Sequence, residues 1–221
     1  MLAETNILDR LATSATIAEK HLYYGVSWNA YLSLLDDLGD DRPGGIRLTY
    51  IDGILEMMSP KRLHEQITRL IDMILTLMTF ELGMNLDNCG AMTLRVDLQE
   101  KGGEPDSCFY VANESKVRGV AEIDLQVHPP PDVVLEVDIT SPSLDKMKLY
   151  AVAGAPEVWR YDGAQMRFFV LSSDQEYQFS THSRSFSHLT AERLTELIKI
   201  GREHGSTAML QAVKLDVQSR Q

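Results

Sequence analysis

The segment VVLEVDI, residues 133–139, has the pattern of a buried β-strand that carries two carboxylates. Side chains alternate across a strand, so Val134, Glu136 and Asp138 share one face and four apolar side chains share the other. Glu136 and Asp138 then have Cα atoms roughly 6.5 Å apart. Charges within an apolar strand are costly unless they are paired, hydrated or bound to a cation. The segment therefore lies at a solvated sheet edge or at a site, and the strand alone favours neither.

The residues after this strand favour the site. Ser141 is suited to cap a helix and Pro142 to occupy its first position, so the strand runs directly into a helix. Junctions of this kind are where sites commonly form in open α/β sheets. A helix that begins there brings Lys146 or Lys148 within reach of the two carboxylates.

The remaining chain alternates strand and helix patterns. Asp52-Gly53 is the signal of a type I′ turn and predicts a hairpin over residues 46–60. Periodicity predicts helices over residues 27–39, 61–83 and 188–205, and strands near residues 91–99, 106–111, 157–161, 166–172 and 176–180. This mixture indicates an α/β or α+β fold with a mixed β-sheet flanked by helices. We treat residues 1–221 as one domain, with residues 1–20 as an N-terminal arm and residues 206–221 as a tail expected to fray.

Composition limits the classes of function. A net charge of −11 and a pI of about 5.0 argue against a protein that coats nucleic acid nonspecifically, because such binding neutralises phosphates. A nuclease is not excluded, since a basic groove can coexist with an acidic remainder. The two cysteines, Cys89 and Cys108, are expected to be reduced. We expect a cytoplasmic protein, because we find no secretory signal and charged residues interrupt the longest apolar-rich segment, residues 67–82.

A further acid, Asp106, follows Pro105 at the start of a strand. Pro-Asp is a common turn dipeptide, but here it precedes the acid pair and a lysine. This order of motifs resembles the Uma family of restriction endonucleases, a branch of the PD-(D/E)XK nuclease superfamily. The resemblance runs from about Trp28 to Ile198. It rests on YIDGILEMMSP at residues 50–60, the helix that opens with His64, Pro105-Asp106, VVLEVDITSPS at residues 133–143 and DKMKLYAVAGAPEVW at residues 145–159.

The resemblance implies a restriction-endonuclease-like fold in which Asp106 is the PD acid and Glu136 the (D/E) acid. The superfamily lysine would fall two residues after Glu136, where this chain has Asp138. Lys146 on the following helix matches instead, and Asp138 then joins the metal shell or orients the lysine.

Glu56 and His64 match two more positions that recur at the site of this family. Interpreted from the residues alone, Glu56 is an exposed strand residue and His64 bonds locally at a helix N-terminus. For each of these two residues, the structural interpretation and a functional role at the site are equally supported.

The resemblance implies hydrolysis of DNA phosphodiester bonds, and the clustered carboxylates suit Mg²⁺ or Mn²⁺. Asp106 and Glu136, with Asp138 or a backbone carbonyl, would hold the metal, which activates a water and polarises a phosphoryl oxygen. Lys146 would orient or deprotonate that water, or stabilise charge on the phosphate. Glu56 would bind the same metal or a second one.

Two other classes of function stay open. One is a catalytically silent nuclease fold used as a binding or assembly module, and the other is a hydrolase of another phosphoester. A basic groove would favour DNA, whose backbone must be neutralised beside the metal. The residues available for such a groove are Lys61, Arg62, Arg69, Lys146 and Lys148. The helix that contains Leu63 and the hairpins also suggest a homodimer, which suits the cutting of two strands.

Overall fold

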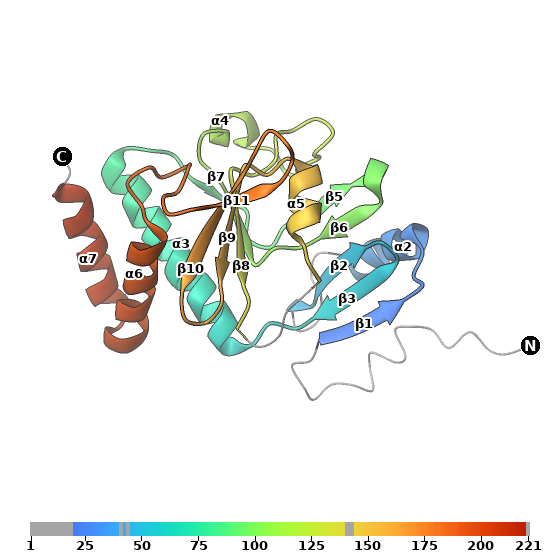
Figure 1. Cartoon of the computed structure of the whole chain (residues 1–221), viewed down its shortest axis with the longest axis horizontal. Coiled ribbons are helices and arrows are strands. Elements are labelled where there is room, and N and C mark those ends of the chain that lie inside the picture. Colours follow the sequence, from blue (N-terminus) through green and yellow to red (C-terminus); the bar gives the residue numbers. More distant parts are fainter. Residues whose placement is uncertain (1–19, 40–41, 43–44, 140–143, 220–221) are drawn as a thin grey trace, which may run out of the picture.

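The computed structural model describes residues 20–39, 42, 45–139 and 144–219 (Figure 1). These residues build two β-sheets, and residues 104–106 form the shortest of the three segments that connect them. The N-terminal sheet lies at one end of the molecule and a layer of C-terminal helices at the other. The mixed strand and helix content expected from the sequence is confirmed.

The N-terminal sheet is antiparallel and has the strand order β1-β3-β2-β6-β5. Its strands are β1 (Lys20–Tyr24), β2 (Arg47–Ile51), β3 (Ile54–Met58), β5 (Leu94–Val96) and β6 (Lys101–Gly103). Between β2 and β3, Asp52 and Gly53 have φ angles of 50° and 82°, the left-handed conformations that a type I′ turn needs. The hairpin that the Asp-Gly pair predicts is therefore confirmed.

Helix α2 (Trp28–Leu38) packs on this sheet. The Ser27 hydroxyl accepts a hydrogen bond from the Ala30 amide and so caps the helix, as its sequence predicts. Tyr31 and Leu34 are buried against Leu48 and Tyr50 of β2 and form a small separate core.

The second sheet is mixed and has the strand order β11-β10-β9-β8-β7-β4. Its strands are β4 (Asp87–Asn88), β7 (Ser107–Tyr110), β8 (Val133–Val137), β9 (Glu157–Tyr161), β10 (Met166–Leu171) and β11 (Tyr177–Ser180). The β8–β9 pair is parallel and the other pairs are antiparallel. Two short helices, α4 (Glu114–Val117) and α5 (Met147–Ala153), belong to the connections before β8 and β9.

The two faces of β8 contact different cores, as its alternating sequence predicts. Val133 and Leu135 pack in the large core beneath the long helix α3 (Arg62–Leu82). Val134 packs on the opposite side with Leu149 of α5. The face that carries Glu136 is therefore the face covered by α5, and the strand is buried along its whole length.

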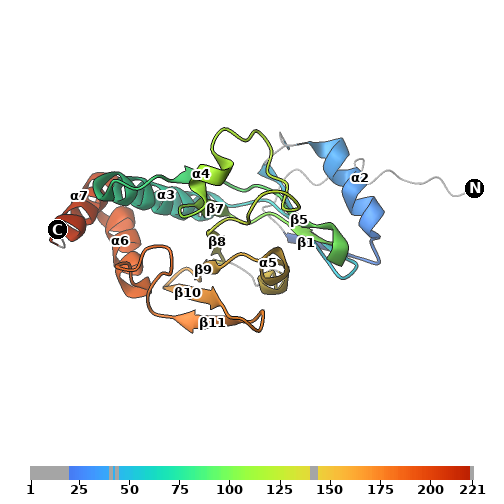
Figure 2. The same ribbon diagram turned by 90° about the horizontal axis from the view of Figure 1, so that it is seen from above.

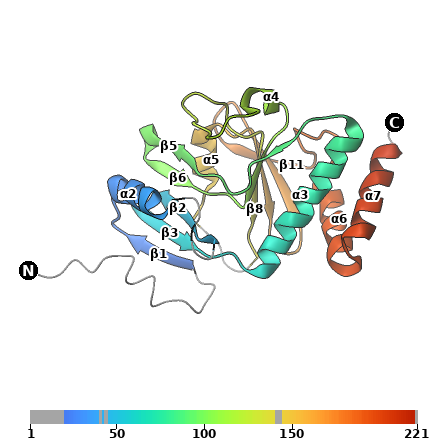
Figure 3. The same cartoon turned by 180° about the vertical axis from the view of Figure 1, so that it is seen from behind.

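The C-terminal segment forms two helices, α6 (Ala191–His204) and α7 (Ser206–Gln218), which lie beside α3 (Figures 2 and 3). Met209, Val213 and Val217 of α7 are buried in the large core. The expectation that residues 206–221 fray is therefore wrong for residues 206–218, because an apolar stripe along α7 packs on α3.

Other local predictions need correction or lie outside the description. The strand expected over residues 91–99 is shorter, because residues 97–99 form a 3₁₀ turn (η2, Asp97–Gln99) in which Leu98 is 94% exposed. The predicted cap Ser141-Pro142 lies outside the described residues, as does most of the expected arm 1–20. Both cysteines are free thiols, as expected. In the described part of the chain, no helix combines the length and the apolar character needed to cross a membrane.

Candidate functional site

Two of the acids predicted from the sequence lie side by side: Asp106 directly precedes β7, and Glu136 lies on the neighbouring strand β8. Ser107 pairs with Leu135 across the antiparallel β7–β8 ladder, and the Asp106 amide donates to the Leu135 carbonyl at 3.0 Å. Asp106 is therefore adjacent to Glu136, at the point where the chain passes from the first sheet to the second. Their side chains are almost fully buried, with residue exposures of 3% and 5%.

Three groups surround the Asp106 carboxylate. Oδ2 accepts hydrogen bonds from the Val137 amide at 2.5 Å and lies 2.9 Å from Nε2 of His64. Oδ1 forms an ion pair with Arg47. Because a buried carboxylate needs such partners, this arrangement fixes the orientation of Asp106.

His64 lies in the first turn of α3 and is neutral at pH 7. Burial, together with the positive charges of Arg47 and Lys146, lowers its pKa to about 4. Its contact with a carboxylate oxygen places the ring proton on Nε2, which leaves Nδ1 as an acceptor. Nδ1 is buried and has no hydrogen-bond partner among the described residues. A carboxylate that holds one imidazole nitrogen while the other keeps a lone pair is an arrangement used to orient an acceptor.

Arg47 is a site residue that the sequence reasoning missed. It comes from β2, and its Nη2 also bonds to Oε1 of Glu65 on α3 at 2.8 Å. Burial lowers the pKa of Arg47, and the nearby carboxylates of Glu65 and Glu136 oppose this effect. The available signal in the sequence was a cation at the start of the strand pattern RLTYI, directly before the Asp52-Gly53 turn.

Glu136 is held by Lys146, the residue that precedes α5. Lys146 Nζ lies 3.0 and 3.1 Å from the two carboxylate oxygens and donates to the Glu104 carbonyl at 3.0 Å. Tyr150, one turn along α5, donates its hydroxyl proton to Oε1 of Glu136. Burial, followed by the charge of Glu136, raises the pKa of Tyr150, so its hydroxyl stays protonated. Tyr150 was also missed, because nothing local distinguishes it from a core aromatic residue.

Two further residues expected at the site lie at its margins. Glu56 is only 2% exposed, so its interpretation as an exposed strand residue is wrong. Its Oε2 accepts the Leu144 amide at 3.0 Å and lies 3.7 Å from Lys20 Nζ. Asp138 accepts hydrogen bonds from Arg160 of β9 at 2.7 and 3.1 Å. The structure thus brings Asp106, Glu136, His64 and Lys146 together and ties Glu56 and Asp138 to neighbouring segments.

The donor set fits a hydrated oxygen-seeking cation and not an all-protein cage. In the described part of the chain, no three His, Cys, Asp or Glu side chains are grouped so that they could hold a metal ion. Asp106 and Glu136 offer two adjacent carboxylates, and Mg²⁺ is commonly bound by one or two carboxylates together with water and phosphate oxygens. Their oxygen chemistry therefore suits Mg²⁺ or Mn²⁺.

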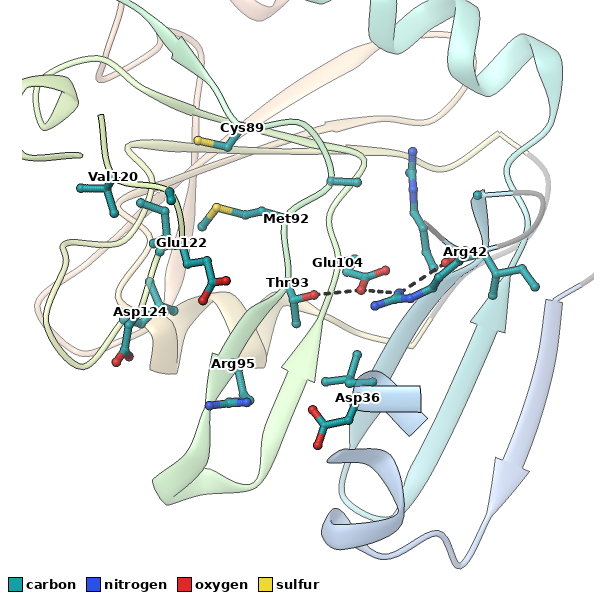
Figure 4. Close-up of a pocket in the computed structure, with 18 of the residues that line it drawn as sticks. Asp36, Arg42, Cys89, Met92, Thr93, Arg95, Glu104, Val120, Glu122 and Asp124 are labelled. Carbon is teal, nitrogen blue, oxygen red and sulfur yellow. Dashed lines mark hydrogen bonds and ion pairs between the residues drawn. The ribbon is translucent and has the colours of Figure 1, made fainter. Parts of the chain in front are cut away.

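A cleft of about 1140 Å³ opens beside this site, between the N-terminal sheet and residues 120–126 (Figure 4). Glu104 lies in its wall, where Arg42 and Thr93 both bond to it. Acidic side chains outnumber basic ones in the lining: Asp36, Glu65, Asp87, Asp97, Glu104, Glu122 and Asp124 against Arg42, Arg47 and Arg95. None of the five basic residues expected to form a groove lines this cleft.

Comparison with protein families assigns the chain. The family Uma2, described as "Putative restriction endonuclease", matches residues 28–200. The chain belongs to the Uma2 family. The match includes the site and every strand except β1, and the resemblance inferred from the motifs is confirmed.

A solved structure supports the fold. The crystal structure of "a putative nuclease belonging to DUF820" from Anabaena variabilis ATCC 29413 superposes with a TM-score of 0.50 at 14% sequence identity. The alignment covers 78% of this chain and 99% of that chain. At this identity the similarity shows the fold alone. Comparison with curated proteins gives no match.

Proposed function

We propose that this Uma2 protein is a metal-dependent endonuclease that hydrolyses DNA phosphodiester bonds, with Asp106 and Glu136 as the metal ligands. The observation that carries the proposal is the adjacent pair of buried carboxylates, just before β7 and on β8, each matched by a cation. Burying two acids side by side is costly, and a catalytic cation site explains why the chain does so. The family description supplies the restriction-endonuclease class.

The bound cation would supply an activated water and polarise a phosphoryl oxygen. His64 Nδ1 would accept a hydrogen bond from the attacking water and so align it. With a pKa of about 4, the imidazole is a weak base at pH 7, so its role is to orient the water and not to remove its proton.

Lys146 acts through Glu136. Its ammonium has three donors, and three acceptors engage them: both oxygens of Glu136 and the Glu104 carbonyl. A fully engaged ammonium is poorly placed to exchange protons with water. We therefore assign it the positioning of Glu136 and the stabilisation of negative charge that develops on the phosphate.

The charge of the cleft favours one alternative. A polyanionic duplex is repelled by a lining with more acids than bases, whereas a small phosphoester tolerates it. A hydrolase of a smaller phosphoester is therefore the second candidate function.

Hydrolysis assays with Mn²⁺ test the proposal and separate the candidates. We expect the wild type to nick supercoiled plasmid, Glu136→Gln to lose this activity, and Glu114→Gln to retain it. Glu114 is a matched control because it is also largely buried and ion-paired, with Arg118 on α4. Cleavage of bis-p-nitrophenyl phosphate without nicking would favour the second candidate. Absence of both activities in the folded wild type would contradict the hydrolase assignment.

A further inference from the structure

Access of a cation to Asp106 is limited to one oxygen. Oδ2 already accepts the Val137 amide and faces His64 Nε2, so both of its lone pairs are engaged. Oδ1 faces Arg47. A cation that binds Asp106 must therefore approach the oxygen that the Arg47 guanidinium contacts, and it meets a like charge there.

Arg47 is also the site cation that reaches the cleft. Arg47 and its second partner, Glu65, both line the cleft, whereas Lys146 does not. The Glu65 side chain is 38% exposed, so it can yield its place without leaving a buried charge unpaired. The guanidinium thus stands between the carboxylate that would hold the metal and the space through which a substrate would arrive.

The partners of Arg47 are of the kind that a phosphate can replace. Among the described residues, its guanidinium forms ion pairs with two carboxylates, Asp106 and Glu65. A guanidinium presents five donors in a planar fork that matches the oxygens of a carboxylate or a phosphate. Lys146 differs, because a backbone carbonyl anchors its ammonium in addition to Glu136.

We propose that Arg47 is an exchangeable counter-ion of Asp106: a divalent cation displaces it, and the displaced guanidinium binds the phosphate of the substrate. This inference rests on the proposed function, since it assumes that Asp106 is a metal ligand. It adds a substrate-binding role for a residue outside the motif acids. It also couples the two events, because metal binding releases the group that recognises phosphate.

Mn²⁺ titration calorimetry tests the competition. Arg47→Gln removes the competing charge, so we expect it to bind Mn²⁺ about tenfold more tightly than the wild type, a change of about 1.4 kcal/mol. Arg47→Lys keeps the charge and loses the fork, so its Mn²⁺ affinity should stay near that of the wild type. Arg193→Gln is the matched control, because Arg193 also bridges two carboxylates, Asp216 and Glu196, but lies on α6.

Titration of inorganic phosphate into the Mn²⁺-loaded proteins tests the second part of the proposal, that the displaced Arg47 guanidinium binds phosphate. We expect phosphate binding to be lost in Arg47→Gln, weakened in Arg47→Lys and unchanged in Arg193→Gln. Circular dichroism identifies any variant that fails to fold. If Arg47→Gln does not fold, the comparison of Arg47→Lys with the wild type tests phosphate binding. Phosphate binding by Arg47→Lys equal to that of the wild type would overturn the assignment.

The outcomes separate this inference from the proposed function. If folded Arg47→Gln protein binds Mn²⁺ no more tightly than the wild type, the proposed competition between Arg47 and the cation is wrong, but the proposed metal site is not contradicted. If the folded wild type binds no Mn²⁺ at millimolar concentration, both the proposed metal site and the proposed competition are wrong.

Discussion

At the scale of single residues, the charges buried at the site are matched pair by pair. Asp106 faces Arg47, and Glu136 faces Lys146. A buried ion pair contributes little net stability because desolvation offsets the attraction, but removal of one partner leaves an uncompensated charge. The site is therefore sensitive to any substitution that changes the charge of one member.

Lys146→Met tests this sensitivity. Loss of the ammonium leaves Glu136 buried without its cation, so we expect the free energy of unfolding to fall by about 3–5 kcal/mol. Chemical denaturation measures this change. The double variant Lys146→Met/Glu136→Gln should recover part of it. Arg167→Met, which breaks the more exposed pair with Asp162, should cost about 0–1 kcal/mol. Equal losses at the two sites would contradict the account.

His64 predicts a pH dependence of stability in protein kept free of divalent cations by a chelator. The unfolded imidazole takes up a proton near pH 6.5, but the folded one does so only near pH 4. Between these values the unfolded state binds more protons, so stability falls as the pH is lowered, by at most about 3 kcal/mol.

Denaturation of the wild type and of His64→Gln from pH 7 to pH 4 measures this contribution. Glutamine can still donate to Asp106 and does not titrate, so the variant should lose less stability than the wild type over this range. Parallel pH profiles for the two proteins would contradict the assigned pKa.

Single residues also show how much of the candidate site can be predicted from the sequence. Strand alternation and the next helix indicate Glu136 with Lys146 or Lys148, and the resemblance to the family selects Lys146 and adds Asp106. Arg47 lies 59 positions before Asp106, which it contacts, and no local pattern reports such a contact. The role of Tyr150 could not be predicted for a different reason, since its ring packs in the core like that of any other buried aromatic residue.

At the scale of elements, hydrophobic periodicity correctly predicts the helices and strands that have a strong repeat in their own sequence. The long helix α3, the β2–β3 hairpin and the two faces of β8 all have strong repeats and are confirmed. The sequence reasoning missed β1, β4 and β6: β4 has only two residues, β6 reads Lys-Gly-Gly, and KHLYY of β1 does not alternate between polar and apolar residues. They exist because a neighbouring strand offers hydrogen bonds.

Strand β6 illustrates this point and leads to a prediction. It reads Lys-Gly-Gly and pairs with β2 and β5, and a Cβ at Gly102 would lie 2.6 Å from the Tyr31 hydroxyl. Glycine is needed here for the close approach of α2 to the sheet. We expect Gly102→Ala to cost about 1–3 kcal/mol in thermal or chemical unfolding.

A Tyr31→Phe background supplies the control for this substitution. The Tyr31 hydroxyl is buried without a hydrogen-bond partner among the described residues, so its removal alone should cost little. The cost of Gly102→Ala should fall only in part in this background, because the ring carbons Cε1 and Cζ, 2.7 and 3.0 Å from the added Cβ, remain. An unchanged cost would show that the ring of residue 31, and not its hydroxyl, causes the clash.

At the scale of the whole molecule, the distribution of charge decides between the two candidate substrates. The chain carries a net charge of −11, and Glu122 and Asp124 are exposed in the wall of the cleft. If a duplex passes along this cleft, its phosphates meet these acids. The homodimer expected from the sequence stays a prediction, which sedimentation velocity can test.

Charge reversal at the cleft tests the path of the substrate. If DNA lies there, Glu122→Lys/Asp124→Lys should bind a fluorescent duplex more tightly than the wild type, with a steeper dependence on salt. Glu176→Lys/Glu203→Lys makes the same change in net charge at exposed positions that do not line the cleft. Equal gains in the two variants would show that net charge, and not the cleft, governs binding.

Binding of Mn²⁺ tests the central claim, that Asp106 and Glu136 form a cation site, most directly. Electron paramagnetic resonance of Mn²⁺ mixed with the protein measures the free ion, and it needs no substrate. We predict binding at millimolar concentration or below in the wild type, and at least about tenfold weaker binding in Asp106→Asn, a change of about 1.4 kcal/mol. Equal affinity in the two folded proteins, or none in the wild type, would contradict the account.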